Sequence, residues 1–194
     1  MTARREEKGK QTVKTMVKIG TLVLAVVVPL LLCAGAQQKP DVWAPLRFFV
    51  GAWEGTGKGE SGEATVERGY EFVLGGKFLQ AKNKSTYKPQ EKNPKGEVHE
   101  DLGYFSCDRG RKKFVLRQFH VEGFVNQYAL DSVSEDGKTL VFVSEAIENI
   151  APGWRARETY KRVSDAEFVE MFELAAPGKE FELYSESRLK RKQR

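Results

Sequence analysis

The sequence predicts an all-β protein, an up-and-down antiparallel β-barrel of about eight to ten strands. From Gly51 onward, short runs rich in Val, Tyr and Phe alternate with turn signals, and helical periodicity is almost absent. The breaks between the runs carry turn-forming residues, such as LGG at 74–76 and EDGK at 135–138. A meander of that many twisted strands tends to close on itself, because closure removes the exposed strand edges.

Residues 1–36 are predicted to be a signal segment. They contain IGTLVLAVVVPLLLCAGA, an uncharged apolar run that ends in the A-x-A pattern of a secretory cleavage site. The part before this run is long for such a signal, so either Met16 is the true start or residues 1–15 are an extension. The protein is therefore expected to be exported, to the periplasm or out of the cell.

Two alternatives for this segment stay open. Residues 19–36 are long enough to remain in a membrane as an uncleaved anchor. Cys33 could instead carry a lipid, although Leu32 stands where the lipid-attachment motif has a small residue. Contact with a membrane is expected only through one of these two routes.

The charge of the chain gives no support for a nucleic-acid partner. The net charge is +5, but residues 1–36 contain six of the 32 Lys and Arg and only two of the 27 Asp and Glu. The remaining chain has a net charge of +1, too small an excess to favour binding to a phosphate backbone. Cys107 is the single cysteine of that part, so the hydrophobic core rather than a disulfide must hold the fold. The oligomeric state stays open.

The elements of the domain can be placed in order along the chain. A short linker is predicted at 37–44 and a single β-barrel domain at 45–194. The domain starts with PLRFFV at 45–50, a compact turn or short helix. The strands are predicted at 51–57, 64–73, 77–87, 98–107, 112–121, 123–133, 138–147, 154–163, 167–175 and 181–190.

A barrel of this size encloses more space than a few side chains fill, and eight strands already hold one small ligand. Several strands have one apolar face with polar interruptions, which is typical of a ligand cavity with a few fixed polar groups. The predicted ligand is a small, largely apolar molecule with one polar or anionic end. The side chains predicted to contact it are Tyr70, Asn83, Arg117, Trp154, Glu158 and Tyr160. The alternative is a filled barrel, in which the same aromatic residues form a packed core.

Arg117 is the candidate anchor for an anionic group, but the sequence does not decide its orientation. The run KKFVLRQFHVEGFVNQY is apolar on both faces, so alternation does not say whether Arg117 or the pair Gln118 and His120 points inward. A buried Arg117 would need a carboxylate partner, because an unpaired buried charge is very costly.

A tryptophan among glycines begins the first predicted strand. Gly51-Ala52-Trp53 resembles the G-x-W signature of the calycin barrels, which include lipocalins and fatty-acid-binding proteins. The resemblance implies that Gly51 and Trp53 belong to a plug that closes one end of the barrel. It also implies a basic side chain from a late strand over the tryptophan, with Arg188 as the candidate and Arg157 as the alternative.

A narrower resemblance joins two stretches of the chain. FFVGAWEGTGKG at 48–59 and the segment 97–124 are similar to the nitrobindin-like haem-binding barrels and to related bacterial barrels. This resemblance implies an interior haem whose iron is bound by a histidine on one of the last strands. The corresponding stretch here, EFELYSESRLKRK, contains no histidine. No cofactor is therefore expected, and the alternative of a haem or nitric-oxide protein would depend on His120, His99 or Tyr184.

Catalytic motifs do not stand out. G-x-S-x-G, H-E-x-x-H and C-x-x-C do not occur, and Cys107 beside the acidic Asp108 is a poor nucleophile. His99 shares a strand face with Glu97 and Asp101, but a solvated rim is the favoured interpretation and no metal site is predicted. The sequence thus favours a binding protein without catalysis, and a hydrolase or isomerase that uses the barrel cavity is the alternative.

Overall fold

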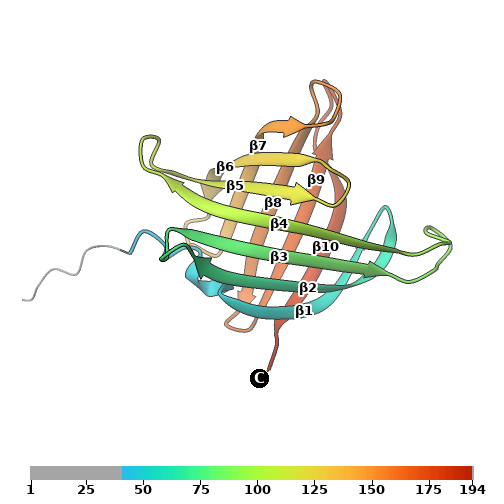
Figure 1. Ribbon diagram of the computed structural model, residues 1–194, viewed down its shortest axis with the longest axis horizontal. Coiled ribbons are helices and arrows are strands. Elements are labelled where there is room, and N and C mark those ends of the chain that lie inside the picture. Colours follow the sequence, from blue (N-terminus) through green and yellow to red (C-terminus); the bar gives the residue numbers. More distant parts are fainter. Residues whose placement is uncertain (1–40, 194) are drawn as a thin grey trace, which may run out of the picture. The chain divides into compact units, whose positions relative to one another are not determined.

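The computed structural model describes residues 41–193, which form a closed antiparallel β-barrel (Figure 1). Each of the ten strands pairs with the next along the chain, and the first pairs with the last to close the barrel. The predicted up-and-down barrel is thereby confirmed, at the upper end of the predicted strand number. The elements are η1 Arg47–Phe49, β1 Gly51–Gly59, β2 Gly62–Val73, β3 Phe78–Tyr87, β4 Glu97–Asp108, β5 Lys113–His120, β6 Val125–Val133, β7 Thr139–Glu148, β8 Arg155–Ser164, β9 Glu167–Ala175 and β10 Glu182–Arg191.

The strands begin and end within two residues of their predicted bounds. Turn residues stop them there. Gly123 and Gly137 have φ angles of 89° and 68°, a left-handed conformation that glycine adopts without steric strain. The predicted signal segment at 1–36 lies outside the described residues. Within 41–193, no helix is long and apolar enough to cross a membrane.

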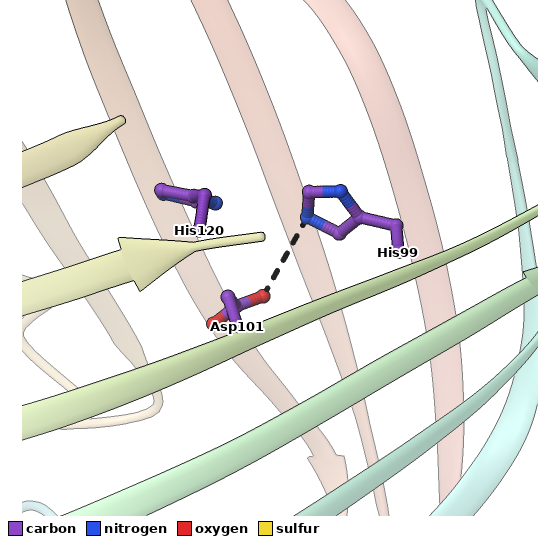
Figure 2. A group of neighbouring side chains, drawn as sticks. All are labelled: His99, Asp101 and His120. Carbon is purple, nitrogen blue, oxygen red and sulfur yellow. Dashed lines mark ion pairs between the residues drawn. The ribbon is translucent and has the colours of Figure 1, made fainter. Parts of the chain in front are cut away.

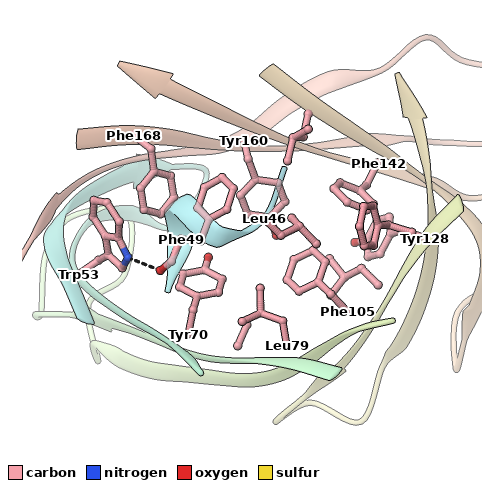
Figure 3. Close-up of a cluster of buried hydrophobic side chains, with 14 of the residues drawn as sticks. Leu46, Phe49, Trp53, Tyr70, Leu79, Phe105, Tyr128, Phe142, Tyr160 and Phe168 are labelled. Carbon is pink, nitrogen blue, oxygen red and sulfur yellow. Dashed lines mark hydrogen bonds between the residues drawn. The ribbon is translucent and has the colours of Figure 1, made fainter. Parts of the chain in front are cut away.

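One end of the barrel is filled by a cluster of aromatic and aliphatic side chains (Figure 3). Trp53 is only 1% exposed, and its indole Nε1 donates a hydrogen bond of 2.7 Å to the carbonyl of Phe49. Its ring packs edge-on against Phe168 with the centroids 4.8 Å apart. Part of the barrel interior is therefore a packed core, and Trp53 closes it at this end.

Arg191, rather than Arg188, covers the tryptophan. The Arg191 guanidinium lies 4.1 Å from the centroid of Trp53 and donates hydrogen bonds to the backbone carbonyls of Phe48 and Val50. Arg188 is exposed and pairs with Glu167 on the outer surface. The reason is alternation along β10, which directs residue 188 outward while residue 191, the register partner of Trp53, reaches over the barrel end.

The segment before β1 also contributes to the core. Trp43 is 8% exposed, and its ring lies 5.3 Å from both Phe72 and Phe114. Leu46 is 1% exposed in the same cluster. Trp43 therefore packs as part of the barrel rather than lying in a linker, and the segment from residue 41 to Val50 covers the filled end.

Candidate functional site

A cavity of about 430 Å³ lies at the other end of β1 from Trp53, where Gly57 and Lys58 contribute to its lining. Its lining alternates around the barrel because every second side chain of each strand points inward. Polar side chains form its floor: Arg68, Asn83, Asp101, Gln118, Asn126, Glu158, Glu170 and Ser187. Apolar side chains form part of its wall: Phe124, Ile147, Ile150, Phe172 and Leu174. The barrel is therefore packed at one end and hollow at the other, with a polar layer between.

A buried ion pair forms one side of the floor. The guanidinium of Arg68 lies 2.8 Å from Glu170 Oε2, and both side chains are 8% exposed. Arg68 also donates hydrogen bonds to the backbone carbonyls of Glu67 and Lys84. Burial of two charges is tolerated here because each is paired and the guanidinium has further acceptors. Arg68 is consequently engaged already and is not a free cation for a ligand.

A second acidic group, Glu158 of β8, lies on the same floor and is 6% exposed. Burial raises the pKa of its carboxyl well above the ordinary value, and the negative charges of Glu170 and Asp101 raise it further. The neutral acid is favoured in this position. In that form Glu158 can donate a hydrogen bond as well as accept one.

Three buried amide oxygens of the cavity lining have no hydrogen-bond partner within residues 41–193: Asn83 Oδ1, Gln118 Oε1 and Asn126 Oδ1. The nitrogens of two of these amides are occupied. Asn83 donates to Asp101 at 2.7 Å, and Asn126 donates to the hydroxyl of Tyr128 at 2.9 Å. A buried acceptor left unpaired costs about 1–3 kcal/mol, so a donor group in the cavity would be stabilised by these oxygens.

Two histidines and an aspartate meet at the side of the cavity (Figure 2). His99 Nδ1 lies 2.6 Å from Glu122 Oε1, and His99 Nε2 lies 3.8 Å from Asp101 Oδ2. His120 Nε2 lies 3.1 Å from the amide nitrogen of Asn126. Burial lowers the pKa of His120, which favours the neutral imidazole, in which one ring nitrogen is a hydrogen-bond acceptor.

Of the six side chains predicted to contact a ligand, Asn83 and Glu158 line the cavity. Tyr70 and Tyr160 lie in the packed core instead, with their rings 5.7 Å and 5.5 Å from Phe49. These two tyrosines therefore fill the barrel rather than line its hollow end.

The other two predicted contacts lie away from the cavity. Arg117 is exposed on the outside, 3.4 Å from Ser106 Oγ, because alternation along β5 directs Gln118 and His120 inward. Trp154 precedes β8, is half-buried and does not line the cavity. The buried cation inside the barrel is Arg68. The sequence could have indicated it, because alternation places Arg68 on the inward face of the strand predicted at 64–73.

The comparisons with known proteins agree with the barrel. Residues 42–191 match the family model described as "THAP4-like, heme-binding beta-barrel domain". The crystal structure of Rv2717c from M. tuberculosis is similar, with a TM-score of 0.57 and 17% sequence identity, over 79% of this chain and 99% of that chain. At that identity the likeness shows the fold alone.

Two further comparisons add little. A de novo designed fluorescence-activating β-barrel aligns with a TM-score of 0.40 and 11% identity, over 75% of this chain and 94% of that one, which is too low to carry an argument. No curated protein matches the sequence at a significant level.

Proposed function

The chain belongs to the family of THAP4-like, heme-binding β-barrel domains, and on that premise we propose that it binds a small molecule in the cavity at the hollow end of the barrel. The observation that carries the proposal is the set of three buried amide oxygens without partners, all of which line this cavity. Native proteins leave few buried polar atoms unpaired, so this cluster indicates hydrogen-bond donors in the cavity, which a bound molecule or ordered water supplies.

The lining defines the chemistry of the ligand. The volume of about 430 Å³ lies in the usual range of small-molecule pockets. Side chains such as Phe172 and Leu174 suit an apolar body. The floor offers acceptors and carboxylates, and its cation, Arg68, is paired with Glu170. Lys58, a second basic residue of the lining, is exposed. The ligand is therefore a small, partly apolar molecule that presents a hydrogen-bond donor or a cationic group to the floor, rather than an anionic end.

The residues present do not fit the haem site that the family resemblance implies. The cavity-lining residues of β10 are Tyr184, Ser185 and Ser187, so the last strand supplies no histidine for iron. The two histidines of the chain lie on β4 and β5, beside the carboxylates of Asp101 and Glu122. Haem carries two propionates, and Arg68, the buried cation of the lining, is already paired with Glu170. A ligand other than haem is the better match to this cavity.

Native mass spectrometry tests the proposal on the protein recovered from cells that express the full chain. We expect a bound mass that is released on denaturation. Phe172→Ala should weaken or abolish this mass, because it removes part of the apolar wall. Phe119→Ala is the matched control, because Phe119 is 45% exposed and does not line the cavity.

Two outcomes would count against the proposal. One is a chain that carries no ligand and binds none from a cell extract. The other is a bound mass that both variants retain equally. A hemin titration belongs to the same experiment: a Soret band that is lost in His120→Ala would make haem the ligand.

A further inference from the structure

We propose that His99, Asp101 and His120 bind one divalent transition-metal ion at the side of the cavity. One ring nitrogen of each imidazole and one oxygen of the carboxylate lie within 4.8 Å of one another (Figure 2). Two imidazoles and one carboxylate form the donor set of many zinc and non-haem iron sites, which keep further coordination positions open. Such a site differs from a haem site because the protein side chains alone bind the metal. It also adds metal binding to the small-molecule binding proposed above.

The fold itself brings the three donors together. His99 and Asp101 are two residues apart on β4, so their side chains share the inward face. His120 is the last residue of β5 and the direct register partner of Asp101. The donors therefore stand on one rigid hairpin rather than on separate loops, as an ordered metal site requires.

Each donor also makes a second contact. His120 Nε2 lies 3.1 Å from the amide nitrogen of Asn126, a contact that metal binding through this ring nitrogen would replace. Glu122 lies 2.6 Å from His99 Nδ1, which leaves Nε2 to face Asp101. Asn83 donates to Asp101 Oδ1 at 2.7 Å, and Asp101 Oδ2 faces His99. Such carboxylate–histidine and amide–carboxylate contacts orient the ligands of metal sites and keep a lone pair directed at the ion.

Among the described residues, no hydrogen bond joins the side chains of the three donors to one another. The 3.8 Å between His99 Nε2 and Asp101 Oδ2 is too long for a hydrogen bond. Ligand atoms around a tetrahedral zinc ion are about 3.3 Å apart, so modest side-chain rotations would bring this set to bonding distance. The Asp101 side chain is 8% exposed, and a cation beside it would neutralise a charge that burial disfavours.

A neighbouring set of groups, Glu97, His99 and Glu122, also lies within 4.8 Å. We favour the first set because it uses both histidines and a buried carboxylate, whereas Glu97 is exposed. In the first set Glu122 orients His99 and is a positioning residue. The open coordination positions of the ion would face the cavity. That a ligand occupies these positions rests on the proposed function, whereas the binding of the metal itself does not.

The test is a zinc titration in competition with a chromophoric chelator, on protein recovered from cells that express the full chain and stripped of metal. We expect one equivalent of Zn²⁺ per chain. Asp101→Asn and His120→Ala should each lower the affinity by about 100-fold or more, and Glu122→Gln by about 10-fold. Glu97→Gln is the control and should leave the affinity unchanged. Co²⁺ in place of zinc should give visible d–d bands, and Asp101→Asn and His120→Ala should each abolish them.

The result that overturns the proposal is a wild-type chain that binds no stoichiometric zinc, or one whose affinity falls in Glu97→Gln but not in Asp101→Asn. The metal-free variants are first checked by circular dichroism for the β-sheet spectrum. If His120→Ala does not fold, His120→Gln takes its place. A wild-type chain that binds zinc but carries no organic ligand would refute the proposed function alone. A wild-type chain that carries the ligand but binds no zinc would refute the metal site alone.

Discussion

The buried pair of Arg68 and Glu170 makes the sharpest prediction about stability. Replacing Glu170 by Gln removes the negative partner and leaves the guanidinium in a site where both side chains are 8% exposed. Removal of one partner of a buried pair typically costs about 3–5 kcal/mol, because the other charge stays desolvated. Backbone carbonyls still accept from Arg68, so we expect the lower part of that range.

Urea unfolding followed by circular dichroism measures this cost. The matched control is Glu71→Gln, which breaks the pair of Lys82 and Glu71, where the two groups are also 2.8 Å apart but both side chains are 58% exposed. An exposed pair contributes about 0–1 kcal/mol, so this variant should be almost neutral. The double variant Arg68→Met/Glu170→Leu should recover most of the stability, because it removes both charges.

Equal effects of Glu170→Gln and Glu71→Gln would refute the reasoning, since the larger cost expected for Glu170→Gln follows from the burial of its pair. A double variant as unstable as the sum of its single variants would refute it as well. That result would mean that Arg68 and Glu170 contribute independently rather than as a pair.

Three further predictions concern other parts of the molecule. Because burial raises the pKa of Glu158 above its unfolded value of about 4.5, the wild type binds more protons when folded and loses stability as the pH rises through and above that value. Glu158→Gln should therefore be more stable than the wild type, by an amount that grows between about pH 4 and about pH 8 in urea titrations; a constant difference would contradict the burial of a neutral acid. Arg191→Ala should cost about 1–3 kcal/mol by thermal unfolding, since it removes the contact with Trp53 and two hydrogen bonds, whereas Arg188→Ala on the outer surface should cost less than about 1 kcal/mol. The export signal is a prediction, and if it is cleaved as expected, N-terminal sequencing of the protein recovered from cells should begin at Gln37; a start at Met1 or Met16 would favour the uncleaved anchor.

The sequence by itself determined the strands and their order. Strand and turn signals are local, so Gly137 and its neighbours mark a hairpin whatever the rest of the chain does. The resemblance of Gly51-Ala52-Trp53 to the G-x-W signature assigned Trp53 to the barrel plug, and its burial at 1% agrees with that role. Asn83 and Glu158 were found because their strands alternate clearly between an apolar and a polar face.

Tertiary structure alone decided which side chains meet. The strand that carries Arg117 is apolar on both faces, so only closure of the barrel settles that Gln118 and His120 point inward. The cover over the plug depends on the register between β1 and β10, which pairs Trp53 with Arg191. Register is a property of two paired strands together, and for this reason alternation within one strand did not reveal it. The same holds for the register of β4 and β5, which places His120 beside Asp101 and so creates the candidate metal site.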